Sequence, residues 1–176
     1  MRKLSVLELN RISVAQFRES VKIPLVVILD DVRSMYNVGS IFRTSDAFRV
    51  ESIYLCGITS RPPHQEIHKT ALGAEDSVDW RYFSDCAEAI MELKSRGYYI
   101  YGVEQVEHSE MLDRLDISNR DKIAVILGNE VKGVQQRLID LCDGCIEIPQ
   151  FGTKHSLNVS TASGIVIWEL WQKMKR

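Results

Sequence analysis

The sequence has little of what metalloproteins, redox proteins and membrane proteins require. It contains four cysteines and four histidines in 176 residues, and its single CxxC pair is Cys142–Cys145. Because this pair has no second pair and no histidine nearby, two small residues beside a turn at Gly144 explain it better than metal chemistry does, so we expect no metal. No apolar run is long enough for a signal peptide or a bilayer span. We therefore expect a cytoplasmic protein that makes no membrane contact.

An excess of positive charge is also missing. The net charge is -2, whereas a non-specific nucleic-acid binder is normally basic, so any RNA contact must use a local patch. With 45% hydrophobic residues, the chain is long enough to bury one real core. We expect one domain over residues 1–176. Residues 1–23 form a short helical extension of it, because Ser13 to Gln16 has the form of a capping box.

Apolar runs alternate with helical patterns along the chain. We expect five strands, at 24–29, 52–56, 98–103, 122–127 and 145–148. Expected helices begin at Asn37 or Ser40, at Asp85 and at Gln135, with a less regular one at 109–115, and a long polar loop covers 61–77. Five alternations of strand and helix predict an α/β fold with a parallel sheet covered by helices on both faces.

The last stretch, from Cys145 to Leu170, organises the rest. A short strand leads through a polar loop to Ser156 and Asn158, which can both cap a helix. That helix is apolar on nearly every face, so we expect it to be buried on most sides. A strand, a loop and a capped helix in this order mark the carboxyl edge of a sheet, where open α/β folds bind ligands.

The glycines do not form the usual nucleotide-binding patterns. GxGxxG is absent, and Gly128–Gly133 has P-loop spacing without the Lys-Ser/Thr that should follow. Three strand ends nevertheless bring polar side chains to one sheet edge. Each side chain has a local structural explanation by itself, as a cap, a turn or a surface ion pair. Together, at one edge of one sheet, they need a functional explanation. These side chains are Asn37, Arg43, Glu130, Ser156 and Asn158.

Three segments resemble, in order, the motifs of the SpoU/TrmH family of RNA ribose 2′-O-methyltransferases, a branch of the SPOUT class: NVGSIFRTSDAF, ILGNEVKGV and IPQFGTKHSLNVSTASGIVIWEL. The resemblance covers the chain from about residue 24 to its end. It implies a deep trefoil knot in the C-terminal third, a homodimer, and S-adenosyl-L-methionine bound in the knot. The five polar residues above become the catalytic set. The implied cofactor contacts are Val103, Gly128, Ile148 and Leu157.

The expected reaction is methyl transfer to a ribose 2′-hydroxyl of tRNA or rRNA. The family assigns proton removal to Arg43, but a guanidinium stays charged in proteins, so we expect it to hold the neighbouring phosphate while that phosphate or a water accepts the proton. Two alternatives are a catalytically silent RNA- or cofactor-binding module and a base-methylating SPOUT enzyme. The expected RNA contacts are Arg33, Arg61, His64, His68 and Lys69.

Overall fold

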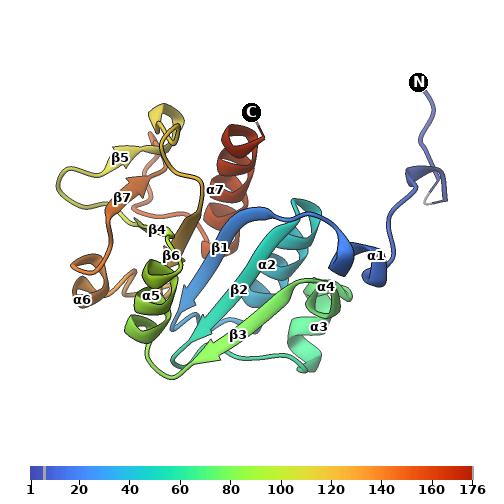
Figure 1. Cartoon of the computed structure of the whole chain (residues 1–176), viewed down its shortest axis with the longest axis horizontal. Helices are drawn as coiled ribbons and strands as arrows, with labels where there is room; N and C mark the ends of the chain where they lie inside the picture. The colour runs from blue at the N-terminus through green and yellow to red at the C-terminus, as the bar shows by residue number, and fades with distance from the viewer. Residues whose placement is uncertain (6, 176) are drawn as a thin grey trace.

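Seven strands form one sheet in the order β3-β2-β1-β6-β4-β7-β5 (Figure 1). The computed structural model describes residues 1–5 and 7–175. All strand pairings given by these residues are parallel, which confirms the predicted sheet type. The strands are β1 (Ile23–Asp30), β2 (Val50–Cys56), β3 (Asp79–Phe83), β4 (Tyr99–Val103), β5 (Glu110–Met111), β6 (Ile123–Leu127) and β7 (Gly144–Glu147).

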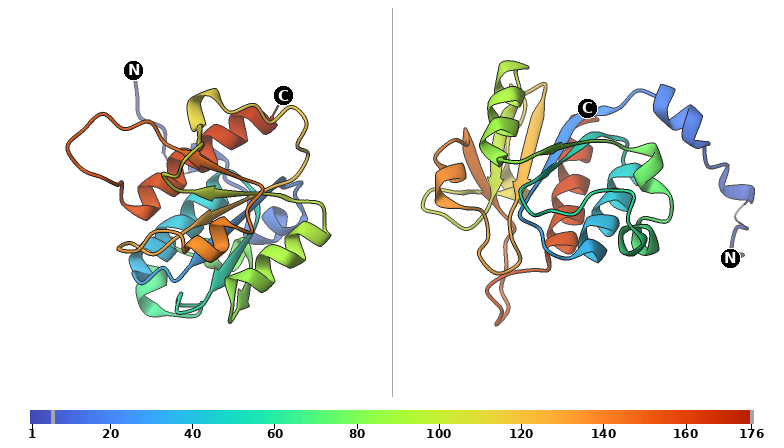
Figure 2. Two further views of the ribbon diagram at one scale, coloured as in Figure 1. Left: turned by 90° about the vertical axis from the view of Figure 1, so that its left-hand side faces the viewer. Right: turned by 90° about the horizontal axis from the view of Figure 1, so that it is seen from below.

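Helices cover both faces of this sheet, as the sequence predicts (Figure 2). One face carries α1 (Val14–Glu19), α2 (Met35–Ala47), α3 (Gln65–Ala71), α4 (Ala74–Ser77) and α7 (Val159–Met174). The other face carries α5 (Cys86–Ser95) and α6 (Gln136–Ile139). Two short 3-10 helices, η1 (Leu7–Leu9) and η2 (Leu112–Arg114), complete the described elements.

The central strand β1 explains why both faces need a cover. Leu25, Val27 and Leu29 join the core under α2 and α7, whereas Val26 and Ile28 join the core under α5. All five side chains are fully buried. Alternate residues of a strand point to opposite faces, and burying one such side chain contributes about 1.5–3 kcal/mol. A continuous apolar run therefore favours a central parallel strand, as predicted.

The expected long polar loop at 61–77 is wrong, because it contains α3 and α4. His64 caps α3 by accepting a hydrogen bond from the Glu66 backbone N–H, and Ile67 and Ala71 on successive turns are buried. The edge strand β3 was also missed. Its residues are exposed or half-buried, so it shows no apolar run, and it is held by pairing with β2.

Other boundaries move by a few residues. The helix expected at 109–115 is instead the two-residue strand β5 followed by η2. The helix predicted at 135–142 is confined to Gln136–Ile139. α2 is capped by the Ser34 hydroxyl, which accepts from the Asn37 N–H, so neither Asn37 nor Ser40 is its cap. Asn158 does cap α7, accepting from Ser160 and Thr161 N–H groups.

The helix α7 is less enclosed than predicted. Its buried residues lie on one side, whereas Ile165 is 37% exposed and Trp168 is 45% exposed. Trp168 and Trp171 stack on each other, and Phe48, the residue that ends α2, meets both rings at steep angles, with all ring centroids 5.3 to 5.5 Å apart. The expectation of burial on most sides is therefore wrong for this chain by itself, because its neighbours cover only one side of the helix.

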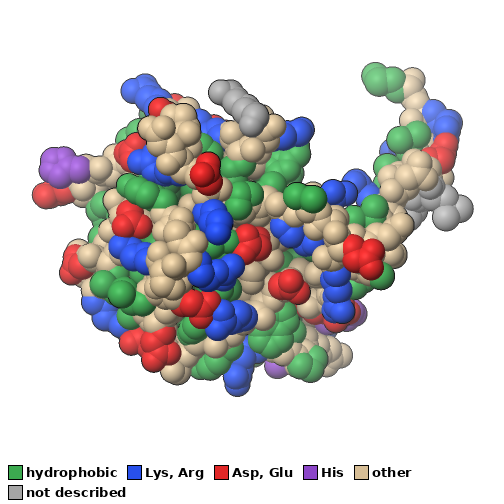
Figure 3. All heavy atoms as spheres, in the orientation of Figure 1, with side chains coloured by type: hydrophobic (Ala, Val, Ile, Leu, Met, Phe, Trp, Pro, Cys, Tyr) green, Lys and Arg blue, Asp and Glu red, His purple; other side chains and the backbone are tan. Residues whose placement is uncertain are grey.

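The N-terminal extension has two parts. Phe17 of α1 is buried, and the Arg18 guanidinium donates to the Asp76 carbonyl at 2.6 Å, so α1 packs on the body. The preceding described residues extend away from it, with Leu4 and Ile12 exposed (Figures 1 and 3). Within the described ranges, no helix combines the length and apolarity that a membrane crossing needs.

Candidate functional site

A pocket of about 700 Å³ lies at the carboxyl ends of β4, β6 and β7. Parallel strands end at the same edge of a sheet, and this edge is where α/β folds bind ligands. The pocket is lined by the four residues predicted to contact a cofactor, each from a different segment: Val103, Gly128, Ile148 and Leu157. The structure therefore brings together residues that are up to 54 positions apart (157 − 103 = 54).

Gly128 begins a tight turn that forms one wall of this pocket. Asn129 and Gly133 exchange backbone hydrogen bonds of 3.1 and 2.8 Å, which folds the chain back on itself. A Cβ atom at position 128 would lie 2.2 Å from the Gly133 carbonyl carbon and 2.3 Å from its oxygen. No side chain fits against this backbone, so the turn requires glycine here.

The Glu130 carboxylate joins this turn to the start of α2. It accepts hydrogen bonds of 3.0 Å from the Arg33 and Ser34 backbone N–H groups and from the Asn37 side-chain amide. Partial burial works to raise the pKa of Glu130, but these hydrogen bonds outweigh it and hold the pKa below its ordinary value. Because all three donors are neutral, the negative charge of Glu130 has no cationic partner among the described residues.

Asn158 extends this network from the opposite wall. Its amide donates to the Asn37 side-chain oxygen at 3.2 Å, while its own side-chain oxygen caps α7. Asn37 therefore contacts both walls and is itself half-buried. Ser156 is exposed and lines the pocket two residues earlier. Four of the five predicted catalytic residues thus lie in one cluster that spans the three motifs.

Arg43 is the exception. It is exposed on α2 and does not line the pocket. The surface ion pairs with Asp31 or Asp46 that could have explained it are not formed by the described residues; the Asp46 carboxylate accepts the Ser77 hydroxyl at 2.5 Å instead. Its position follows from the helix, which carries it about 1.7 turns beyond Asn37.

Sequence reasoning missed Glu104 and Gln105, which directly follow β4. The Glu104 carboxylate accepts from the Val134 N–H at 3.0 Å and from the Gln105 N–H at 2.9 Å. The Gln105 side chain donates to the His155 carbonyl at 2.8 Å. These bonds connect the end of β4 to both loops that border the pocket. The rule that strand ends carry function could have identified them, since both follow a predicted strand.

Carboxylates dominate the charge of the pocket. Glu104, Glu130 and Glu147 line it, against the single ammonium of Lys132. His155 is the only histidine among its lining residues. A pocket with this balance favours a ligand that carries positive charge.

The predicted RNA contacts lie elsewhere and already have partners within the chain. Arg61 lies over the Tyr82 ring at 4.2 Å, His68 pairs with Glu75 at 2.6 Å, and Lys69 pairs with Glu66 at 2.6 Å. His64 and His68 border a second hollow of about 610 Å³, beside Trp80 and Arg18, which shares no lining residue with the first pocket. Arg33 stands apart from them, at the Glu130 network.

The cysteines form no disulfide in this structure. Cys142 and Cys145 both approach Gly102, and burial raises the pKa of the Cys142 thiol to about 12, which favours the neutral thiol. No group of three or more His, Cys, Asp or Glu side chains in the described part of the chain is arranged to hold a metal ion.

Known proteins resemble this chain over most of its length. Residues 24–168 match the SpoU rRNA Methylase family. A 23S rRNA (guanosine-2′-O-)-methyltransferase, RlmB, of Neisseria meningitidis is 32% identical over 83% of this chain and 57% of its own length. The TrmH/SpoU tRNA modifying enzyme of A. aeolicus superposes with a TM-score of 0.80 at 25% identity, over 92% of this chain and 82% of that one.

An AdoMet-bound rRNA methyltransferase from Sinorhizobium meliloti superposes with a TM-score of 0.79 at 25% identity, over 89% of this chain and 59% of that one. The chain spans between 57% and 62% of the length of the curated relatives that it matches. The matched residues 24–168 include the pocket, the first two motifs and all but the last two residues of the third.

Proposed function

Because the chain belongs to the SpoU rRNA methylase family, we propose that it uses S-adenosyl-L-methionine to methylate a ribose 2′-hydroxyl of tRNA or rRNA. One observation carries the proposal: the four predicted cofactor residues line one pocket, and Glu130, Ser156 and Asn158 line it as well. Asn37, 93 positions before Glu130 and 121 before Asn158, bonds to both. Chain segments this distant converge on one cavity in the way that an active site requires.

The pocket suits the proposed cofactor. Its volume of about 700 Å³ lies within the usual range of roughly 300–1,000 Å³ for small-molecule sites. Its carboxylates match a sulfonium cation, and Gly128, Ile148 and Leu157 would hold the ligand largely through backbone groups. When bound, S-adenosyl-L-methionine supplies an activated methyl group, so the reaction needs no metal. Activity that disappears on chelation with EDTA would contradict this part of the proposal.

The residues of the chain then position the RNA. Arg43 stays charged and holds the phosphate beside the target ribose, and that phosphate or a water accepts the hydroxyl proton. Glu130 and Asn37 fix the start of α2, the helix that carries Arg43. Ser156 and Asn158 would contact the ribose from the rim of the pocket.

RNA would approach along the basic groups near the first motif, residues 37–48: Arg33, Arg61, His64, His68 and Lys69. The face that carries α5 is a poor alternative, because its basic and acidic side chains are interspersed (Figure 3). Charge reversal at Arg61 and Lys69 should weaken RNA binding and reduce its dependence on salt. An unchanged salt dependence would place the patch elsewhere.

We also propose that residues 1–176 form one domain with the family's trefoil knot, acting as a cytoplasmic homodimer. The aromatic cluster Phe48, Trp168 and Trp171 supports the dimer, because Trp168 leaves nearly half of its surface uncovered. Light scattering of the wild type should give twice the chain mass of 20.1 kDa, and Trp168→Arg should lower it. A wild-type protein with the mass of one chain, 20.1 kDa, would count against the dimer.

The reaction is tested by its product. We expect methyl label from S-adenosyl-L-methionine to remain on the ribose after complete digestion of the RNA. Alkaline cleavage needs a free 2′-hydroxyl, so the modified position should also resist alkali. Label found only on nucleobases would favour a base methyltransferase, and cofactor binding without any transfer would favour the silent module.

A further inference from the structure

We infer that Phe151 is an aromatic platform on which a base of the RNA substrate stacks beside the methylated ribose. The inference rests on the proposed function, and Phe151 belongs to neither the catalytic nor the cofactor residues named above. Phe151 lies in the loop between β7 and α7, and its side chain is 98% exposed. This loop projects from the body in both views of Figure 2.

The loop begins and ends at the pocket, so the position of Phe151 is tied to the pocket. Gln150, directly before it, lines the pocket. His155, four residues after it, also lines the pocket and accepts the hydrogen bond from Gln105. Phe151 does not itself line the cavity, but Gln150 and His155 on either side of it do, so it lies beside the rim, close in sequence to Ser156 and Asn158.

The opposite rim has the same composition. In the turn after β6, Val131 is 79% exposed and is followed by Lys132. In the β7–α7 loop, exposed Phe151 is followed after two residues by exposed Lys154. Neither lysine forms an ion pair within the described residues. Each rim thus presents one exposed apolar side chain and one exposed ammonium.

This combination matches a nucleotide better than another protein surface. Single-stranded nucleic acid is held by aromatic side chains that stack on bases and by basic side chains that meet the phosphates. A ribose brought to the pocket must leave its base at the rim, where an aromatic face can meet it. The exposed aromatic cluster at Trp168 offers a separate surface for a second copy of the chain, so Phe151 is not needed there.

The test compares Phe151→Ala, Phe151→Leu and Phe151→Tyr with Met91→Ala as the control, because Met91 is 58% exposed on α5. The probes are bulk tRNA and bulk rRNA from cells that lack this chain, assayed by methyl transfer at saturating S-adenosyl-L-methionine. Stacking contributes about 1–3 kcal/mol per base, so KM for RNA should rise roughly 5- to 150-fold in the Ala and Leu variants. Tyr should restore it, kcat should change less than KM, and the control should match the wild type.

Other outcomes overturn the inference. An unchanged KM in Phe151→Ala would remove any role in RNA binding. Wild-type KM in Phe151→Leu would show that apolar contact suffices, and a loss of dimer mass in Phe151→Ala would assign the ring to a second copy. If the wild type transfers no methyl group, the proposed function fails, but filter binding of the same RNAs to the same variants still decides the role of Phe151.

A direct readout does not depend on catalysis. Phe151→Trp places a fluorophore at the rim, and a base stacked on it should quench its emission when RNA is added. The wild type, which contains Trp80, Trp168 and Trp171, provides the background. Quenching equal to the wild type's would contradict stacking at this position.

Discussion

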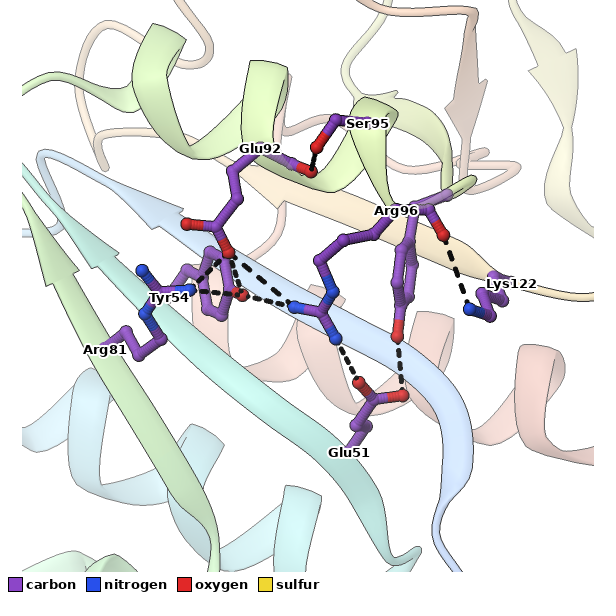
Figure 4. A network of polar contacts seen from close by, with 8 residues as sticks. Glu51, Tyr54, Arg81, Glu92, Ser95, Arg96 and Lys122 are labelled. Carbon is purple, nitrogen blue, oxygen red and sulfur yellow. Dashed lines mark hydrogen bonds and ion pairs between the residues drawn. The ribbon is translucent and has the colours of Figure 1, made fainter.

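Two clusters of polar side chains in this molecule use carboxylates in opposite ways. Under α5, Glu92 accepts from Arg81 and from the Tyr54 hydroxyl at 3.0 Å, with Arg96 3.7 Å away (Figure 4). Glu51 accepts from Arg96 at 2.9 Å and from the Tyr98 hydroxyl at 2.5 Å. Each of these carboxylates has a guanidinium partner. At the pocket, Glu130 accepts three bonds from neutral N–H groups.

The difference distinguishes a network whose charges are compensated from one whose charge is not. In the α5 network, each carboxylate is paired with a guanidinium, so no net charge remains to attract a ligand. The same contacts connect α5 to β2 and β3. Around Glu130, the hydrogen bonds orient and stabilise the carboxylate without neutralising it. A fixed, uncompensated charge beside a cavity is what recognition of a cationic ligand requires. We therefore expect changes to the first network to affect stability and changes near the second to affect activity.

The largest expected effect comes from Arg43, whose charge neither network neutralises. Arg43→Ala should lower kcat roughly 10²–10³-fold while cofactor binding, measured by thermal shift, stays close to the wild type's. Arg43→Lys should also fail, since one ammonium cannot replace the planar fork. Arg114→Ala is the matched control, because that side chain is 85% exposed and lies outside the three motifs. Full activity in Arg43→Ala would refute the mechanism but not the reaction.

Glu130→Gln tests the functional side of the comparison. Gln keeps one acceptor oxygen but turns an NH₂ group toward a backbone N–H, so we expect a loss of about 1.5–3 kcal/mol in unfolding free energy together with weaker cofactor binding. Glu107→Gln, in an exposed loop, is the control. Denaturation curves and cofactor titrations measure the two effects. If stability falls and cofactor affinity does not, Glu130 only fixes the start of α2.

The pH dependence of stability tests the same comparison, because the lowered pKa of Glu130 predicts its direction. In the folded protein the pKa of Glu130 lies below its ordinary value of 4.5. The contribution of its carboxylate to the free energy of unfolding is therefore fully present above pH 4.5 and is lost as the pH falls through the folded pKa. The stability gap between the wild type and Glu130→Gln should therefore stay constant above pH 4.5 and shrink below it. Denaturant midpoints measured between pH 3 and 7 check this. A gap that widens in acid would contradict the lowered pKa.

The smallest effect is expected in the α5 network. Glu92→Gln should cost up to about 1 kcal/mol of unfolding free energy, because its partners Arg81 and Arg96 are 52% and 40% exposed. High salt should reduce the difference further. Methyl transfer should be unchanged. A fall in kcat of the size expected for Arg43→Ala would break the distinction between the two networks.

The sequence by itself determined the parts of this protein that depend on local pattern. Continuous apolar runs such as residues 24–29 identified strands buried on both faces, because a parallel strand covered by helices has no polar face. Their places after predicted strands, together with the resemblance to the SpoU/TrmH motifs, made Gly128, Glu130 and Asn158 candidate site residues. The edge strand β3 was not predicted because its exposed side chains show no apolar pattern. The helix α3 was not predicted because its buried residues are separated by charged and polar ones.

Only the tertiary structure decided which of those residues meet. The Glu130 carboxylate reaches the N–H groups of Arg33 and Ser34 because β1 and β6 are neighbours in the sheet, a pairing that no local pattern encodes. The same packing places Glu104 against the Gly128–Gly133 turn and leaves Phe151 and Trp168 uncovered. Local propensity depends on neighbours within a few residues, whereas a site at a sheet edge depends on strand order, and strand order follows from how the whole core packs.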